Sequence, residues 1–141
     1  MTSDDQYGAF AAGYDAGRAQ IVFRRVVADL ETPIGAYLKL AEGRKNTFLL
    51  ESVQDGATVG RYSMIGFDPD IILKVEKGQA SINRNAGLTP DAFTPVSEPP
   101  LDVLRALVAE SQAEVPPGLP STAAGIYGYL GYDMVRLMEV L

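Results

Sequence analysis

The chain of 141 residues contains neither cysteine nor histidine. It therefore lacks the thiolate and imidazole ligands of zinc sites, the cysteine nucleophile and the Ser-His-Asp triad. The absence of cysteine also excludes disulfides and is typical of a protein kept in a reducing compartment, so we predict a cytoplasmic location. These two absences remove the commonest nucleophile and transition-metal chemistries from consideration.

Positive charge is also scarce. Twelve Lys and Arg stand against eighteen Asp and Glu, which gives a formal net charge of −6. Nucleic-acid binding relies on a basic surface, and the sequence has no basic cluster larger than Arg24-Arg25 or Arg44-Lys45. The N-terminus has no apolar run, and the long uncharged stretch 115–132 is interrupted by proline and glycine. We therefore predict no nucleic-acid partner, no signal peptide and no membrane span.

The composition that remains is that of a folded domain. Hydrophobic residues make up 47% and charged residues 21% of the chain, so neither a disordered nor a fibrous protein is indicated. Residues 1–20 contain spaced glycines that weaken a helix, although Phe10 and Tyr14 lie one turn apart. We predict a loosely attached N-terminal arm over 1–20 and a main region over 21–141.

A helix is strongly indicated after residue 31. Thr32 is a good N-cap and Pro33 suits the first helical position, while Gly43 is typical of a left-handed C-terminal cap. Apolar residues recur between them at helical spacing and predict one buried stripe. These residues are Ile34, Tyr37, Leu38 and Ala41.

The other elements are predicted from alternation and turn residues. Strands are expected at 21–28, 46–53, 61–67, 71–76, 79–83 and 123–132. Helices are expected at 100–114, with Leu101, Leu104, Leu107 and Val108 on its apolar face, and after Asp133 as its N-cap. Strands with helices between and after them predict an α+β fold, with mostly antiparallel sheets packed with helices.

The end of the sequence carries an unfinished pattern. Apolar residues continue at helical spacing to Leu141, without a glycine, a proline or a basic last turn. A natural C-terminus rarely has this pattern. We therefore expect the chain to be the front part of a longer polypeptide.

Two polar residues interrupt an apolar strand near position 50. Phe48, Leu50 and Ser52 would share one face, with Leu49, Glu51 and Val53 on the other. We expect both faces to be buried, where an unpartnered polar group costs about 1–3 kcal/mol.

Two interpretations of these polar residues are open. In a structural one, Ser52 bonds a neighbouring backbone group and Glu51 pairs with Arg61. In a functional one, the carboxylate, hydroxyl and guanidinium in an apolar wall bind a free amino acid, whose ammonium needs an acceptor and whose carboxylate needs donors. The functional interpretation requires Glu51 and Ser52 to be buried beside a cavity.

Four segments in order resemble anthranilate synthase component I. They are ETPIGAYLKL (31–40), FLLESV (48–53), GRYSMIG (60–66) and GIYGYLGYDMVR (125–136). The similarity extends from about Phe10 to the end. It implies the N-terminal part of that family's two-sheet fold.

The resemblance also implies a function. In this family the N-terminal region holds a feedback site for L-tryptophan, while the larger C-terminal region holds chorismate, Mg²⁺ and the catalytic groups. The whole enzyme is a lyase of L-tryptophan biosynthesis. It converts chorismate and ammonia, supplied from glutamine by an amidotransferase partner (component II), to anthranilate and pyruvate. We therefore expect this chain alone to carry no catalytic residue and no metal site, and to be inactive.

The family's inhibitor motif falls on Leu50, Glu51 and Ser52. The resemblance implies that Ser52 bonds L-tryptophan and that Glu51 helps to receive its ammonium. Arg61 matches a basic residue that the family has about ten positions later. We also expect unpaired strand edges and exposed apolar surface on the isolated chain, which favour self-association.

Two alternatives remain open. One is the N-terminal region of aminodeoxychorismate synthase component I, and the other is a stand-alone amino-acid-binding module. The combination of Glu31-Thr32-Pro33 with the segment 60–63 favours anthranilate synthase over the first alternative. The unfinished pattern at the end of the chain opposes the second.

Overall fold

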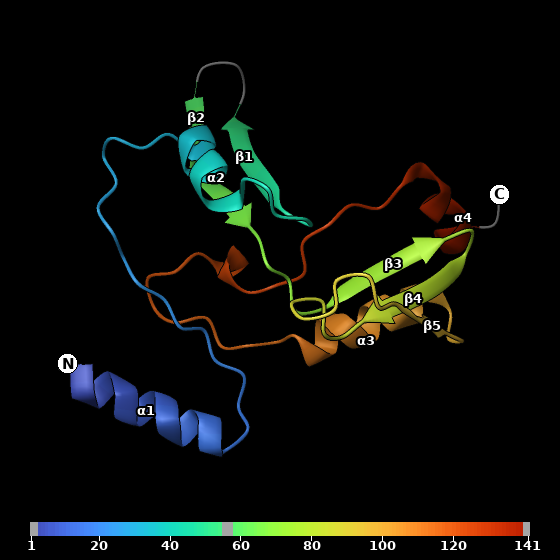
Figure 1. Cartoon of the computed structure of the whole chain (residues 1–141), viewed down its shortest axis with the longest axis horizontal. Helices are drawn as coiled ribbons and strands as arrows, with labels where there is room; N and C mark the ends of the chain where they lie inside the picture. The colour runs from blue at the N-terminus through green and yellow to red at the C-terminus, as the bar shows by residue number, and fades with distance from the viewer. Residues whose placement is uncertain (1–2, 55–57, 140–141) are drawn as a thin grey trace. The chain divides into compact units, whose positions relative to one another are not determined.

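The computed structural model describes residues 3–54 and 58–139, and side chains over 7–51 and 62–139. Its helices and strands follow one another along the chain as labelled in Figure 1: α1 (Ser3–Asp15), α2 (Pro33–Ala41), β1 (Phe48–Gln54), β2 (Thr58–Gly66), β3 (Ile72–Glu76), β4 (Gln79–Asn83), β5 (Thr94–Val96), α3 (Pro100–Glu110) and α4 (Val135–Met138). Short 3₁₀ turns lie at Ser121–Ala123 and Tyr132–Met134. Helices with small antiparallel sheets confirm the predicted α+β class.

The strands form two sheets. β1 and β2 pair antiparallel as a two-stranded sheet, and β3, β4 and β5 form a three-stranded sheet in that order. The chain divides into two compact units, one of 1–25, 76–80 and 97–141 and the other of 26–75 and 81–96. The division into an arm (1–20) and a regulatory region (21–141) stays a prediction.

The start and end of α2 follow from its capping residues. The Thr32 Oγ1 accepts a hydrogen bond from the N–H of Gly35 at 3.0 Å, and Pro33 is the first helical residue. Gly43 follows the helix with φ of 73°, the left-handed region in which glycine has no Cβ to clash. The capping signals in the sequence therefore predicted this helix correctly.

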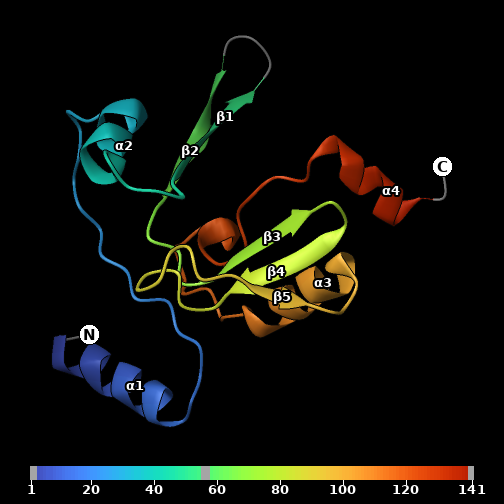
Figure 2. The same cartoon turned by 45° about the vertical axis from the view of Figure 1, so that its right-hand side comes forward.

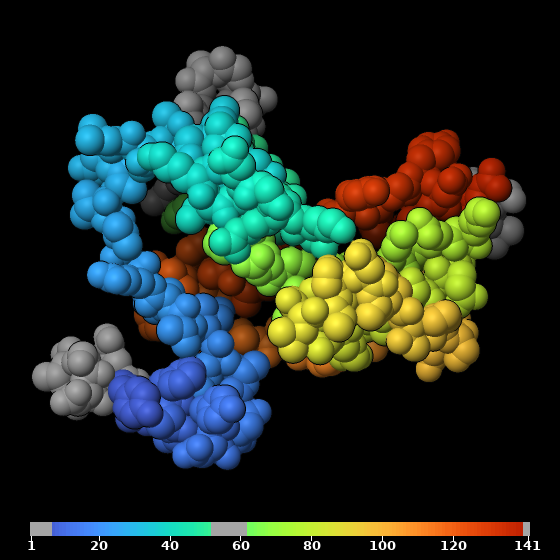
Figure 3. Space-filling model, viewed as in Figure 1, coloured from blue at the N-terminus to red at the C-terminus, as the bar shows by residue number. Residues whose placement is uncertain are grey.

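The apolar stripe of α2 is only partly covered. Ala41 is buried and Tyr37 half-buried, whereas Ile34 is 57% and Leu38 is 56% exposed. α2 contacts β1. It lies beside the β1–β2 hairpin in Figures 1 and 2 and forms part of the molecular surface in Figure 3. The prediction of one continuous buried stripe is therefore wrong for its two exposed members.

The turn between β3 and β4 was predicted at its correct position. Lys77 and Gly78 have φ of 51° and 77°. Two consecutive residues with positive φ form the type I′ turn, whose twist matches that of antiparallel strands. The segments 71–76 and 79–83 accordingly become the β3–β4 hairpin.

Two predicted strands are absent from the described parts of the chain. Residues 21–28 are irregular, and 123–132 consists of 3₁₀ turns and irregular chain. Val27 is 85% and Tyr129 is 94% exposed. β-branched and aromatic residues favour strands only where a neighbouring strand and a packed face stabilise them, and neither is supplied here.

The two later helices also differ from expectation. α3 ends at Glu110 rather than 114, and Val103 and Leu107 are its buried apolar residues, while Val108 is 49% exposed. Asp133 lies inside a 3₁₀ turn and makes no capping hydrogen bond, so the predicted N-cap is wrong. The short strand β5 carries Pro95 and was not predicted, because the sequence around it resembles a loop.

Among the residues whose side chains are described, few apolar ones are buried in either unit. Ala41 and Ala86 are buried in the unit of 26–75 and 81–96, and Ala80, Val103 and Leu107 in the other. Over the residues described, no helix has the length and apolar character needed to cross a membrane.

Candidate ligand-binding strand

The residues of the predicted tryptophan site lie on the β1–β2 hairpin. Leu50 and Glu51 are on β1, where their Cα partners on β2 are Met64 and Ser63. Ser52 follows on β1, and Arg61 is on β2. The fold thus places all four predicted residues on two paired strands.

The described side chains of this set are open to solvent. Leu50 is 51% exposed, and Glu51 is also exposed. The expectation that both faces of this strand are buried is therefore wrong for these two residues in the chain as it stands. Burial then gives no reason to place a ligand here, and the site assignment rests on family resemblance alone.

Ser52 and Arg61 lie outside the residues whose side chains are described. The backbone pairing around them is nevertheless informative. The regular register is interrupted between Glu51 and Val53, whose partners on β2 are Ser63 and Val59. Such an irregularity changes the direction in which side chains point, and bulges are frequent beside functional sites. In a regular strand, Arg61 and Ser63 would point to the same face, because they are two residues apart. The interruption of the ladder means that this rule does not settle the direction of the Arg61 side chain.

The first residues of β1 are fixed by contacts on two sides. The Tyr37 hydroxyl, from the middle of α2, lies 2.8 Å from the Thr47 Oγ1, directly before β1. The ring of Phe48 lies against the backbone of its ladder partner Gly66. β1 is thus attached to both α2 and β2 where it begins.

A third contact joins the segment before β1 to the end of β2. Arg44 forms an ion pair with Asp68, and its guanidinium lies over the Phe67 ring, 5.0 Å from the centroid. The ion pair is substantially exposed, so its own contribution to stability is small. The stacking of the guanidinium on Phe67 is a second contact of the Arg44 side chain.

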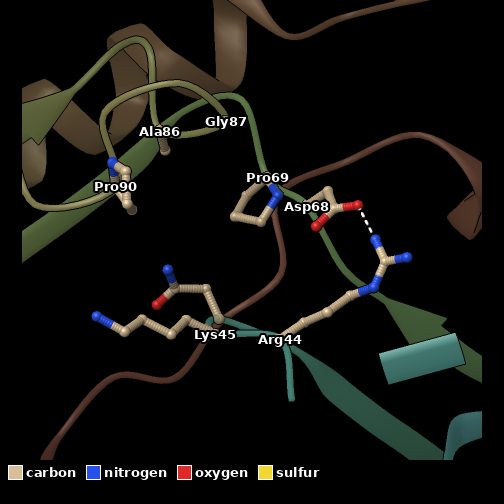
Figure 4. Close-up of a pocket in the computed structure, with 8 residues that line it drawn as sticks. Arg44, Lys45, Asp68, Pro69, Ala86, Gly87 and Pro90 are labelled. Atoms are coloured by element: carbon tan, nitrogen blue, oxygen red, sulfur yellow. Dashed lines mark hydrogen bonds and ion pairs between the residues drawn. The ribbon is translucent and has the colours of Figure 1, made fainter. Parts of the chain in front are cut away.

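A shallow pocket opens beside this ion pair (Figure 4). Its volume is about 250 Å³, and it is lined by Arg44, Lys45, Asn46, Asp68, Pro69, Ala86, Gly87 and Pro90. None of the four predicted site residues lines it. In the sequence, the residues that line this pocket could be identified only as a basic pair and as turn residues. Which of them lie together depends on how the loops fold.

The charges of this pocket are compensated. Arg44 reaches Asp68, while Lys45 extends in the opposite direction (Figure 4). The Lys45 Nζ is 3.7 Å from an Asp91 carboxylate oxygen, and both side chains are more than 70% exposed. With each cation beside a carboxylate, the pocket offers no preference for an anion, and we assign it no ligand.

The acidic residues form no metal site in the described part of the chain. Among the described residues, no group of three or more Asp, Glu, His or Cys side chains lies close enough together to hold a metal ion. These residues therefore do not fit the Mg²⁺ that the family resemblance implies for the full-length enzyme. That cofactor stays a prediction for the rest of the protein.

Comparison with known proteins identifies similar sequences. No family model matches the chain. An anthranilate synthase component 1 of Cereibacter sphaeroides is 50% identical over 141 residues, which are 100% of this chain and 28% of that protein. Proteins of the same name from Mycolicibacterium smegmatis and Pseudomonas aeruginosa are 39% and 41% identical, over 99% and 80% of this chain and 25% and 22% of their own lengths.

The similarity extends further than the four motifs predicted, because it includes the residues before Phe10. It covers the whole chain at a level of identity far above chance, and it falls on the N-terminal part of the relatives. The chain spans about a quarter of the length of the curated relatives it matches. Over its whole length, the chain therefore matches the N-terminal region of anthranilate synthase component 1 proteins.

Proposed function

We propose that this chain is the tryptophan-sensing N-terminal part of an anthranilate synthase component I. In this proposal the whole enzyme forms anthranilate and pyruvate from chorismate and ammonia in L-tryptophan biosynthesis. Ammonia comes from glutamine through the amidotransferase partner, component II. The catalytic groups and Mg²⁺ belong to the rest of the enzyme, in the cytoplasm, and the 141 residues alone are inactive.

The observation that carries the proposal is the match to the Cereibacter sphaeroides protein over the whole chain. That protein and its two counterparts share the name anthranilate synthase component 1, which favours this family over aminodeoxychorismate synthase. Their greater length opposes a stand-alone binding module as the counterpart of this chain. The exposure of Leu50 and Glu51 does not support the ligand site by itself.

The exposed apolar residues of β1 and α2 are consistent with a ligand site that is completed by residues outside this chain. Leu50 on β1 and Ile34 and Leu38 on α2 are each about half exposed or more. In a monomeric soluble protein such surface is more often covered than left open. We propose that another part of the enzyme covers this strand and supplies the second wall of the tryptophan site.

The proposed regulation is a shift between two states of the enzyme. Tryptophan would bind the less active state more tightly, with Glu51 receiving its ammonium, Ser52 bonding the ligand and Arg61 facing its carboxylate. A difference in binding free energy of about 1–3 kcal/mol between the states is typical of allosteric coupling. Ligand binding then changes activity without any contribution of this strand to the chemical step.

A chimeric enzyme tests the proposal directly. The segment of the Cereibacter sphaeroides protein that matches this chain is replaced by the 141 residues, and anthranilate is followed by its fluorescence. The chimera should form anthranilate from chorismate and ammonium and be inhibited by L-tryptophan. A chimera that is active but not inhibited by tryptophan would contradict the proposed tryptophan-sensing role, and only the family assignment would stand.

Substitution of Ser52 tests the ligand site. Ser52→Phe should abolish inhibition of the chimera, because the larger ring occupies the place of the ligand and removes the hydroxyl. Ser111→Phe is the matched control, since Ser111 is an exposed serine that follows α3. Inhibition of equal strength in both variants would exclude Ser52 from the site.

The isolated chain provides a second test. Given chorismate, ammonium and Mg²⁺, it should give no anthranilate fluorescence, because the catalytic groups are proposed to lie elsewhere. Turnover by the purified 141 residues would contradict this part of the proposal. Its oligomeric state, measured by light scattering over a concentration series, tests the predicted self-association through exposed apolar surface.

A further inference from the structure

We infer that the hydrogen bond between Tyr37 and Thr47 positions β1 for ligand binding, which makes Tyr37 a positioning residue of the tryptophan response. The regulatory half of this inference rests on the proposed function. Its structural half, that the bond holds β1 against α2, can be tested on the chain alone. Tyr37 does not contact the ligand in this account and acts only through β1.

The bond joins two separate elements. Tyr37 lies in the middle of α2 and is half-buried, and its hydroxyl is 2.8 Å from the Thr47 Oγ1. Either oxygen can be the donor. Thr47 is also half-buried and directly precedes Phe48, the first residue of β1. A partly buried hydroxyl loses more when its partner is removed than an exposed one, because water replaces the lost bond less completely.

The connection that the bond closes has an unusual backbone. Between α2 and Thr47 the chain contains Gly43 and Asn46, with φ of 73° and 56°. Asparagine tolerates left-handed backbone better than most residues other than glycine, so the connection turns tightly here, and contacts that close the turn help to keep it. The Tyr37–Thr47 bond is one such contact, and it follows Asn46 directly.

α2 has contacts of its own that do not involve the Tyr37 hydroxyl. Its N-terminus is capped by Thr32, and Lys39 forms a 2.5 Å ion pair with Glu31. Loss of the Tyr37 hydroxyl leaves both of these contacts in place and keeps the ring. Removing the hydroxyl should therefore free the start of β1 without unfolding the helix.

The position of Thr47 connects this bond to the proposed ligand residues. Glu51 lies four residues further along a strand that rises about 3.3 Å per residue, roughly 13 Å away. β1 is paired with β2 in regular register from Phe48↔Gly66 to Glu51↔Ser63, which links the start of β1 to Glu51. A small rotation where β1 begins would then reach Leu50 and Glu51, the two proposed ligand residues that lie before the interruption of the ladder.

The regulatory test uses the chimera with hydroxyl-deletion variants. Tyr37→Phe and Thr47→Ala should each raise the tryptophan concentration needed for half inhibition about twofold to tenfold, the range expected for one hydrogen bond. Thr47→Ser restores a hydroxyl and should return inhibition to the unmodified level. Tyr14→Phe is the matched control, because Tyr14 is 72% exposed on α1.

The double variant distinguishes the bond from two separate effects. Tyr37→Phe combined with Thr47→Ala should weaken inhibition no more than either change alone, because both remove the same interaction. Changes in half-inhibition should also exceed any change in kcat/KM for chorismate without tryptophan. Additive effects, or equal losses of activity and inhibition, would indicate a general structural role and overturn the inference.

The structural test uses hydrogen exchange of the isolated chain. Tyr37→Phe should speed exchange of the β1–β2 ladder amides about twofold to tenfold and leave those of β3 and β4 unchanged. If the unmodified chimera ignores tryptophan, the proposed function and the regulatory half of this inference fall together. If the unmodified chimera is inhibited by tryptophan but Tyr37→Phe leaves amide exchange of the β1–β2 ladder unchanged, this inference is wrong and the proposed function is unaffected.

Discussion

The ring of Phe48 occupies the space that a Cβ at Gly66, its antiparallel partner on β2, would need. An added Cβ at Gly66 would collide with this ring, so the absence of a side chain is what lets the aromatic ring cover the neighbouring strand. The glycine that ends the third sequence motif thus has a packing role. The same contact fixes the start of the strand that carries Leu50 and Glu51.

The first prediction concerns this contact. Gly66→Ala should destabilise the chain by about 1–3 kcal/mol, because the ring or the backbone must move to admit a methyl group. Urea unfolding followed by far-UV circular dichroism measures the loss. Gly87→Ala is the control, since a Cβ there meets open space, and it should be neutral or slightly stabilising. Equal effects of the two substitutions would show that the ring moves aside at little cost.

The buried Asn83 is the subject of the second prediction. It is 1% exposed, its Nδ2 donates to the Thr89 carbonyl at 2.6 Å, and its Oδ1 accepts from the Asn85 N–H at 2.9 Å. Asn83→Ala removes both bonds and should cost about 1–3 kcal/mol of unfolding free energy. The exposed Asn85 is the matched position, and Asn85→Ala should change stability by less than about 0.5 kcal/mol in the same urea titration. A loss at Asn85 as large as that at Asn83 would contradict this account.

The third prediction tests the cap of α2. Thr32→Ala should destabilise α2 by about 0.5–2 kcal/mol, because the Gly35 N–H then loses its acceptor. Thr32→Ser supplies an equivalent oxygen and should recover most of the loss. Amide exchange of the first turn of α2 reports the change locally. Protection that is unaffected by Thr32→Ala would mean that Pro33 alone determines where the helix begins.

The sequence predicted those elements whose signals are local. Thr32, Pro33 and Gly43 marked both ends of α2 without any knowledge of its neighbours, and Lys77-Gly78 marked the β3–β4 turn. Caps and tight turns depend on the dihedral angles and hydrogen bonds of a few consecutive residues. Such features can often be read from one sequence, although the cap predicted at Asp133 was wrong.

The two predicted strands that are absent depend on partners distant in the chain. Residues 21–28 and 123–132 have the composition of strands, but Val27 and Tyr129 are largely exposed and the segments remain irregular. Strand propensity mainly reflects packing against neighbours, and an isolated segment has none. The same reason explains Leu50 and Glu51, whose burial was inferred from apolar neighbours in sequence rather than from a covering layer.

The candidate site was predicted from resemblance, and its residues stay a prediction. The four motifs led to the correct family match, and the strands predicted at 46–53 and 61–67 correspond to β1 and β2. The irregular pairing between Glu51 and Val53 was not foreseen, because alternation assumes an unbroken ladder. Which side chains meet a ligand therefore has to be decided by binding experiments.

The last prediction assigns a chemical role to Glu51. If its carboxylate receives the ligand's ammonium, Glu51→Gln should weaken inhibition of the chimera by L-tryptophan about tenfold, equivalent to about 1.4 kcal/mol. Indole-3-propionate lacks the ammonium, so its weaker inhibition should not change. Glu42→Gln is the matched control, because Glu42 is an exposed carboxylate after α2. If Glu51→Gln weakened both ligands equally, the carboxylate would shape the site without contacting the ammonium, and another acceptor would have to be sought.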